Sequence, residues 1–299
     1  MCLRNMTFAS VTMVLATVPA ANAQQPVFYS QWMHSDVARA WSQGFTGQGA
    51  KVTVIDTFQG GIKGSLTGQR EWRSHGGWTS KQLELIAPAA SVIKHQWTDK
   101  RLPQLASGFN ILNLSYGMKQ LTHVVDRGAY RTLDPMNQSI VDHARNGTAV
   151  VVKSAGNNGG RPVGVMSATH SDALSRALKG GQSVIFVGAL NKHGPRAAGE
   201  KARMAAYSNV AGADKKVNSR FVVVGVAPST GLQGTSFAAP QVSGYAAILH
   251  SKFQKASPTQ ISNQILATAR RDTIADYSLH THGQGEADLS RALAPRRIR

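Results

Sequence analysis

The sequence predicts an α/β fold, in which a mainly parallel central sheet is flanked by helices. Three observations carry this prediction. Short apolar runs rich in β-branched residues recur along the chain, segments of helical character separate them, and no internal repeat, low-complexity tract or long linker divides the sequence. A chain of 299 residues with this alternation is expected to form one domain with a sizeable core and right-handed crossovers.

Six apolar runs are the candidate strands. Each is nearly continuous in apolar character, which is typical of strands buried on both faces of a parallel sheet. The runs are KVTVID (51–56), SVIK (91–94), NILNLS (110–115), AVVVKS (149–154), SVIFVGA (183–189) and FVVVGVA (221–227).

Five segments between and after these runs are the candidate helices. They cover residues 35–41, 79–86, 134–146, 236–252 and 258–270. The last of them follows a Ser-Pro pair, which suits the first turn of a helix.

Residues 1–23 have the features of a cleavable secretory signal peptide. A single Arg precedes an apolar stretch at about 8–18, and Ala-Asn-Ala (21–23) stands before polar sequence. The alternative is a membrane anchor, but the apolar run is shorter than the ~20 residues that span a bilayer. We therefore expect a secreted or periplasmic bacterial protein, with residues 24–299 as one mature domain and no transmembrane segment. The only cysteine, Cys2, would be removed with the signal.

The chain is strongly basic. Its 33 Lys and Arg residues against 15 Asp and Glu residues give a net charge of +18. Such a charge favours contact with an anionic surface or an acidic protein partner, and the alternative is a diffuse, solvated basic surface without a defined ligand. No basic block, zinc-finger spacing or basic–aromatic repeat indicates a specific nucleic-acid partner.

Polar residues at the carboxyl ends of the predicted strands are the candidates for chemistry, because parallel sheets form their ligand sites there. Asp56 ends the first run, and Asn157 follows the fourth within SAGNNGG. Ser236 stands in GTSFAAPQVSG, at the start of the last-but-one predicted helix. Taken singly, these residues are equally a turn-capping carboxylate, an Asn-Gly loop and an N-cap serine.

The stretch GTSFAAPQVSG (234–244) resembles the nucleophile motif of subtilisin-like serine proteases. In the family's order, VTVIDT resembles the aspartate strand, NILNLSYG the substrate-binding strand, and NGTAVVVKSAGNNG the strand and turn of the oxyanion asparagine. The resemblance runs from about Trp32 to Leu293. It implies a subtilisin-like three-layer fold and a serine endopeptidase, which hydrolyses a polypeptide substrate through an acyl-enzyme and uses no cofactor.

The resemblance also implies roles for individual residues. Asp56, His75 and Ser236 would form a catalytic triad, in which the imidazole takes the serine proton and the carboxylate orients the imidazole. Asn157 and the Ser236 amide would donate hydrogen bonds to the oxyanion. Pro240 would lie in the first turn of the helix, where no N–H is needed.

The histidine segment departs from the family pattern, which reads roughly His-Gly-Thr-His-Val-Ala-Gly. This chain has HGGWTSK at 75–81, and Phe58 stands where the family usually has Gly. Trp78 and Lys81 place bulk and charge where the family packs small residues. His75 is expected to be the base because no other histidine has a better context, and the alternative is a helix-capping or surface histidine.

Substrate contacts are implied by the same resemblance. Ser115, Tyr116 and Gly117 match the strand that pairs with an extended peptide. Ala155 and Gly156 would border the pocket for the residue before the cleaved bond, and small residues there favour an apolar or aromatic side chain. The alternative is that these are buried sheet residues with no role in substrate binding.

Two features that accompany many family members are missing from the sequence. No folding propeptide is recognisable between the signal and the first catalytic strand, and no Asp-x-Asp spacing indicates a required metal. The rival hypothesis is a pseudoprotease whose basic surface binds an anionic partner. Retention of Asp56, His75, Asn157 and Ser236 together favours an active protease.

Overall fold

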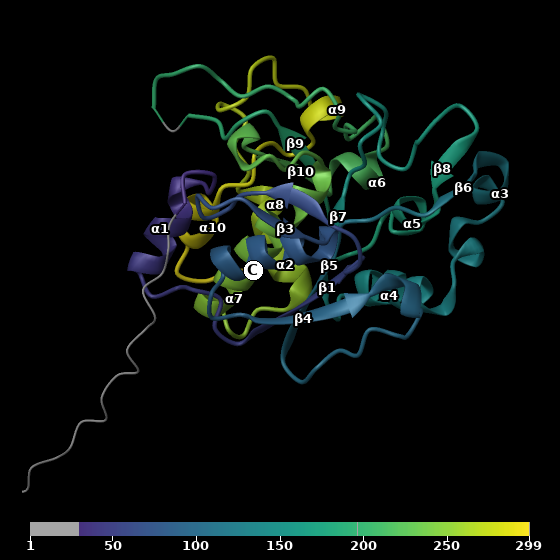
Figure 1. Cartoon of the computed structure of the whole chain (residues 1–299), viewed down its shortest axis with the longest axis horizontal. Coiled ribbons are helices and arrows are strands. Elements are labelled where there is room, and N and C mark those ends of the chain that lie inside the picture. The colour runs from purple at the N-terminus through teal and green to yellow at the C-terminus, as the bar shows by residue number, and fades with distance from the viewer. Residues whose placement is uncertain (1–29, 196, 299) are drawn as a thin grey trace, which may run out of the picture.

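The computed structural model describes residues 30–195 and 197–298, so the predicted signal peptide, residues 1–23, lies outside the described residues. A six-stranded sheet runs through the centre, in the order β10-β9-β7-β5-β1-β4 (Figure 1). All of its neighbouring strands are parallel. The strands are β1 (Ala50–Asp56), β4 (Ser91–Gln96), β5 (Phe109–Leu114), β7 (Val150–Ser154), β9 (Val184–Leu190) and β10 (Phe221–Gly225). The six predicted runs form these six strands, so the predicted parallel sheet is confirmed.

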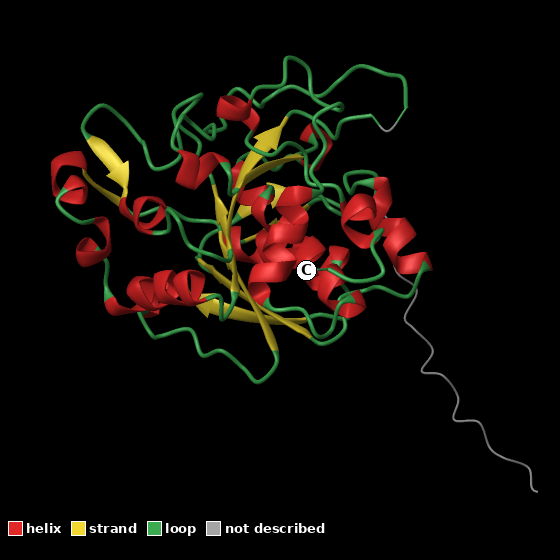
Figure 2. Ribbon diagram, turned by 180° about the vertical axis from the view of Figure 1, so that it is seen from behind, coloured by secondary structure: helices red, strands yellow, loops and turns green. Residues whose placement is uncertain are grey.

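Helices cover both faces of the sheet, as the view from behind shows (Figure 2). The helices are α1 (Ser35–Ser42), α2 (His75–Ile86), α3 (Thr122–Asp126), α4 (Pro135–Asn146), α5 (Ala173–Ala177), α6 (Lys215–Asn218), α7 (Ala239–Lys252), α8 (Pro258–Ala267), α9 (Leu279–His282) and α10 (Leu289–Leu293). Two separate buried clusters result, one under α1, α2, α7, α8 and α10 and the other under α4, α5 and α6. Successive residues of one strand alternate between them, since Val150 and Val152 join the first cluster and Val151 joins the second. The predicted three-layer α/β fold is therefore confirmed.

Two small antiparallel sheets stand outside the central sheet. One is a hairpin of β2 (Ile62–Gly64) and β3 (Glu71–Arg73), and the other pairs β6 (Lys119–Leu121) with β8 (His170–Asp172). None of these strands was predicted, because three residues are too few for a periodic pattern.

Strand β4 differs from the prediction that every run is buried on both faces. It lies at the edge of the sheet, with β1 as its only neighbour among the described strands, and Ile93 is 40% exposed. The prediction was wrong for the run SVIK (91–94) because it is short, and the strand it forms continues through the polar residues Lys94, His95 and Gln96.

Helices α2 and α7 approach each other closely. Helix α2 begins at His75, earlier than predicted, because Ser74 caps it by accepting a hydrogen bond from the Gly77 N–H at 3.0 Å. At Gly244 of α7, an added Cβ would lie 2.5 Å from Cγ2 of Ile86 at the end of α2. The absence of a side chain at Gly244 is therefore what allows the two helices to pack at this distance.

In the described part of the chain, none of the helices combines the length and the apolar character that crossing a membrane requires.

Candidate active site

Asp56 and His75 are joined by a hydrogen bond at the carboxyl end of the sheet. Asp56 is the last residue of β1 and is 1% exposed. Its Oδ1 lies 2.7 Å from Nδ1 of His75 and also accepts from the Thr57 N–H at 2.7 Å, while Oδ2 accepts from Thr79 Oγ1 at 3.1 Å. Because an ionised carboxylate can only accept, this contact selects the tautomer of a neutral imidazole that carries its proton on Nδ1 and presents Nε2 as an acceptor. Within the described residues, Nε2 of His75 has no hydrogen-bond partner.

The start of α2 fixes where His75 lies. The Gly76 N–H donates to the Thr57 carbonyl at 2.8 Å, so the helix start is tied to the end of β1. A Cβ on Gly76 would lie 2.8 Å from the ring of Phe58. Phe58, which stands where the family pattern has Gly, therefore packs directly on the glycine that follows His75.

The other departures around His75 are also accommodated. Trp78 is 1% exposed, and its indole N–H donates to the Ile62 carbonyl in the β2–β3 hairpin at 2.7 Å. Lys81 is only half-buried. The bulk that the sequence places after His75 thus fills the space beneath the hairpin.

Ser236 lies in a 3-10 turn, Thr235–Phe237, immediately before α7, and not inside the helix as predicted. It is 9% exposed. Its hydroxyl donates to the Ser115 carbonyl at 3.1 Å, and no hydrogen bond joins it to His75 among the described residues. The His75 ring does lie against the ring of Phe237, with centroids 5.5 Å apart, so the imidazole is beside the turn that carries the serine.

Asn157 is exposed, and its side chain is oriented by Thr235. Oδ1 of Asn157 accepts from both the N–H and the Oγ1 of Thr235, each at 2.9 Å, which leaves the Nδ2 donors for another acceptor. Gly234 has φ 131°, and a Cβ there would lie 3.1 Å from Nδ2 of Asn157. The sequence analysis did not identify Thr235 as a residue of the site, although its position next to Ser236 could have indicated it.

A pocket of about 210 Å³ opens next to Ser236 and Asn157. The five predicted substrate-binding residues all line it: Ser115, Tyr116, Gly117, Ala155 and Gly156. Two charged residues that the sequence did not single out, Lys153 and Asp172, line it as well.

Tyr116 is held rigidly at this pocket. Its ring stacks on Trp97 with centroids 6.0 Å apart, and its hydroxyl donates to Oδ1 of Asn137 at 2.7 Å. Burial raises the pKa of the Tyr116 phenol well above its ordinary value, so it stays neutral.

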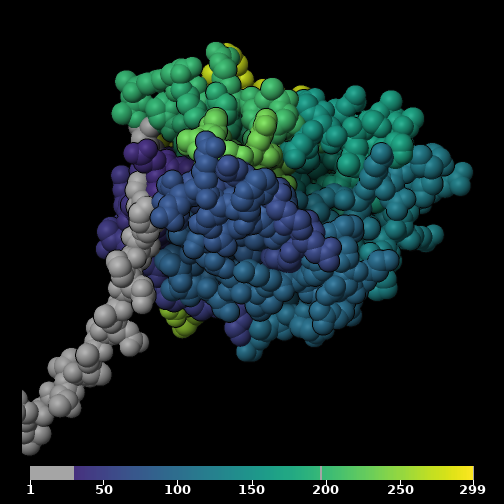
Figure 3. Space-filling view, viewed as in Figure 1, coloured from purple at the N-terminus to yellow at the C-terminus, as the bar shows by residue number. Residues whose placement is uncertain are grey.

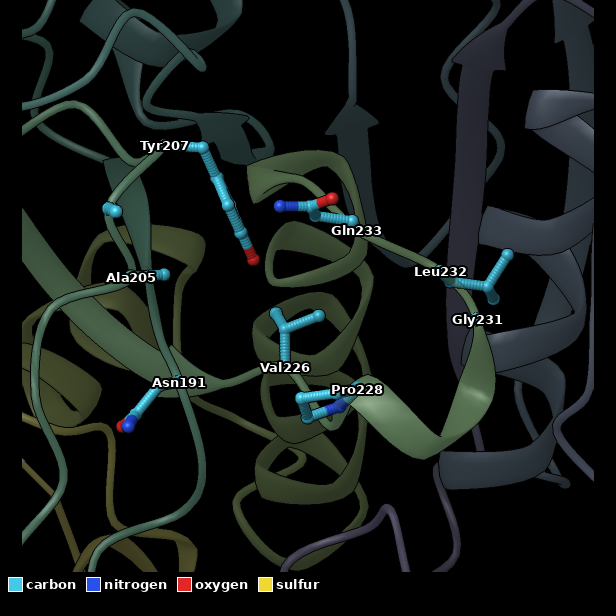
Figure 4. Close-up of a pocket in the computed structure, with 9 residues that line it drawn as sticks. Asn191, Ala205, Tyr207, Val226, Pro228, Gly231, Leu232 and Gln233 are labelled. Atoms are coloured by element: carbon cyan, nitrogen blue, oxygen red, sulfur yellow. The ribbon is translucent and has the colours of Figure 1, made fainter.

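A second, larger hollow of about 670 Å³ borders the segment that leads to Ser236. Figure 4 shows the Tyr207 side chain extending into it toward Val226, with Gln233 close beside the ring. Most of its lining is apolar, including Ala205, Val226, Pro228 and Leu232.

The rim of this hollow is joined to the β2–β3 region, and the two segments lie side by side at the surface (Figure 3). The Ser65 N–H donates to the Thr230 carbonyl at 2.8 Å.

Within residues 30–195 and 197–298, no three His, Cys, Asp or Glu side chains gather as a metal site would require.

Comparison with known proteins gives one family match. The model of the subtilase family matches residues 71–289, a range that begins after Asp56. Alkaline elastase YaB of Bacillus sp. (strain YaB) is 28% identical over 256 residues, and the match covers 77% of this chain and 62% of that protein. Subtilisin DY of Bacillus licheniformis is 35% identical over 133 residues, which cover 43% of this chain and 42% of that protein. This chain therefore spans less than two thirds of the length of these relatives.

Solved structures share the fold at low sequence identity. MycP1 from the ESX-1 type VII secretion system aligns with a TM-score of 0.54 at 18% identity, covering 87% of this chain and 84% of that chain. A lanthipeptide protease aligns with a TM-score of 0.55 at 18% identity, covering 86% of this chain and 91% of that chain.

Proposed function

This chain belongs to the subtilase family, and on that premise we propose that it is a serine endopeptidase acting through Asp56, His75 and Ser236. The observation that carries the proposal is the 2.7 Å hydrogen bond between Asp56 and His75. This bond occupies Nδ1 and leaves Nε2 available as a proton acceptor, and the ring lies beside the turn that carries Ser236. The relatives give no support to the alternative of a binding protein with an anionic partner.

The proposed reaction begins with a rotation of the Ser236 hydroxyl. In the structure this hydroxyl donates to the Ser115 carbonyl, and turning it toward His75 would replace one acceptor by another. Nε2 of His75 then takes the proton as Oγ attacks the peptide carbonyl, and Asp56 stabilises the resulting imidazolium. His75 gives the proton to the leaving amine, and water hydrolyses the acyl-enzyme by the same steps.

Asn157 is proposed to stabilise the oxyanion together with the Ser236 N–H. Thr235 supports this role because it occupies Oδ1 of Asn157 with two hydrogen bonds, so the amide cannot turn its oxygen toward the developing negative charge. Loss of such a side-chain donor costs ~10²- to 10³-fold in turnover, a magnitude measured in subtilisin itself.

The two hollows are proposed to take opposite sides of the cleaved bond. The strand end at Ser115, Tyr116 and Gly117 would pair with the peptide, and the pocket beside Ala155 and Gly156 would take the residue before the bond. The larger hollow at Tyr207 and Gln233 would take residues after the bond.

Export through a signal peptide is part of the proposal. Its test is the mass of the protein recovered outside the bacterial cytoplasm, which is expected to begin at Gln24. Recovery of a chain that retains residues 1–23 would contradict it.

Labelling with a fluorophosphonate probe tests the catalytic assignment. The protein from residue 24 to 299 is expected to label, and Ser236→Ala and His75→Ala are expected to abolish labelling. Matched controls are Ser229→Ala and His123→Ala, because both residues are exposed and lie outside the proposed triad. A folded wild-type protein that does not label would overturn the proposal.

A further inference from the structure

The pocket beside Ser236 contains a buried ion pair, between Lys153 and Asp172. We propose that this pair determines specificity by admitting only uncharged side chains at the residue before the cleaved bond. The inference rests on the proposed function, because it assigns the substrate class of the same site.

Lys153 is placed where a lysine is rarely found. It is the fourth residue of β7 and is 1% exposed, and the alternation of the strand places it on the same face as Val151, which belongs to the second buried cluster. Its Nζ donates to the Ser154 carbonyl at 2.8 Å and lies 3.3 Å from Oδ2 of Asp172. A fully buried lysine requires such partners, because an unpaired ammonium in an apolar cluster is strongly disfavoured.

Asp172 lies beneath the strand that is proposed to bind the peptide. Its Oδ1 accepts from the Met118 N–H at 2.9 Å, and its Oδ2 accepts from Ser175 Oγ at 2.7 Å. A Cβ on Gly117 would lie only 3.1 Å from Oδ2. The carboxylate therefore holds the pocket wall at residues 117 and 118 and faces the pocket at the same time.

The two charges neutralise each other and are both already hydrogen-bonded. A charged substrate side chain that enters would lose its hydration and find no unpaired counter-charge, so it is rejected. Sequence reasoning, which considered only the small residues at 155 and 156, predicted an apolar or aromatic side chain here.

Substitution of one residue of the ion pair by a neutral one should leave the other as an unpaired charge in the pocket, where it can attract a substrate side chain of opposite charge. In Lys153→Met, Asp172 keeps its bonds to Met118 and Ser175, and cleavage after Lys or Arg is expected to rise about tenfold or more relative to cleavage after Ala. In Asp172→Asn, Lys153 remains, and cleavage after Glu is expected to rise by a similar factor. The double variant Lys153→Met/Asp172→Asn should gain neither preference.

The experiment compares these variants on a peptide library that differs only at the residue before the cleaved bond. Lys179 and Asp214 provide matched controls, since they form an ion pair of 2.9 Å at the surface and Asp214, like Asp172, caps a helix. Lys179→Met and Asp214→Asn should leave the profile unchanged. Variants that fold and label with the fluorophosphonate probe but keep the wild-type profile would overturn the inference.

A second measurement separates this inference from the proposed function. In a Ser236→Ala background, calorimetry measures the binding of product-like peptides that end in Ala, Glu or Lys. Charge-dependent changes in affinity in the single variants support the inference even if catalysis is absent, and equal affinities in all variants contradict it. If one single variant does not fold, the other single variant and the neutral double variant still decide the question.

Discussion

Ser115 and Ser236 are joined by two hydrogen bonds that run in opposite directions. The Ser236 hydroxyl donates to the Ser115 carbonyl at 3.1 Å, and the Ser115 hydroxyl donates to the Ser236 carbonyl at 2.9 Å. Asn113 extends the connection, because its Nδ2 donates to Ser115 Oγ at 3.2 Å and its Oδ1 accepts from Ser243 Oγ at 3.0 Å. The end of β5 thus holds the candidate nucleophile and α7 in a fixed relation.

Ser115→Ala should therefore lower both stability and turnover. It leaves the Ser236 carbonyl without its donor, and a buried polar group that loses its partner costs ~1–3 kcal/mol. Chemical denaturation measures the loss in unfolding free energy, and peptide hydrolysis is expected to show a lower kcat with a smaller change in KM. Ser42→Ala in α1 is the control, since Ser42 is exposed. An unchanged kcat would contradict a positioning role for Ser115.

Thr79→Val tests the hydrogen bond from Thr79 Oγ1 to Oδ2 of Asp56. Valine keeps the shape of threonine but removes the donor, so the carboxylate becomes free to rotate away from His75. The rate of fluorophosphonate labelling is expected to fall by about tenfold, in line with the modest net value of one hydrogen bond to a charged group. Thr79→Ser, which restores the hydroxyl, should recover most of the rate. Equal rates in the valine and serine variants would argue against this role.

Gly244→Ala should force α2 and α7 apart, because the new methyl group would lie 2.5 Å from Cγ2 of Ile86. Overpacking of this kind typically costs ~1–3 kcal/mol. The labelling rate should fall as well, since α2 begins at His75 and α7 follows Ser236.

Addition of Ile86→Ala to Gly244→Ala should remove the clash. The double variant should then lose less unfolding free energy than the two single variants added together. Strict additivity in denaturant unfolding would contradict direct contact between these positions.

Stability is expected to fall in mild acid because of two buried histidines. Burial lowers the pKa of His250, which stacks on Phe109 at 4.1 Å, and also that of His282, below the ordinary 6.5. Between the lowered pKa and 6.5 the unfolded chain binds more protons than the folded chain, so the unfolding free energy decreases as pH falls through this range. The difference in unfolding free energy between about pH 8 and about pH 5, measured by denaturant unfolding, should be smaller in His250→Gln than in wild type. The exposed His123→Gln control should match wild type.

The sequence predicted the central sheet well because the inner strands are nearly continuous apolar runs, whereas the edge strand β4 is short and partly polar. It predicted the helix starts less well. Gly76 and Gly77 concealed the first turn of α2, since glycine has low helix propensity, and Ser236 was assigned to α7 although a 3-10 turn precedes the helix. Pro240 was correctly placed, because its fixed φ suits a first turn.

The supporting contacts of the site were harder to predict. Thr79 lies one helical turn after His75, so the position could have been noticed, although its bond to Asp56 depends on how α2 meets β1. Nothing in the sequence around Asp172 indicates that it belongs to the site. It reaches Lys153 only because the β6–β8 pair folds back under residues 117 and 118.

The strand order of the sheet has a consequence for how the chain folds. Asp56 ends a strand near the start of the described chain, whereas Ser236 follows the last strand of the sheet, and the segments that carry them come to the same end of the sheet only after the strands between them have paired. Contacts between residues so distant in sequence form slowly, because loop closure must precede them. We expect a newly made chain to acquire much of its secondary structure before it has an assembled site. Proteolytic activity would then appear late in folding. Partly folded copies of the chain, which lack an assembled site, would not cleave one another.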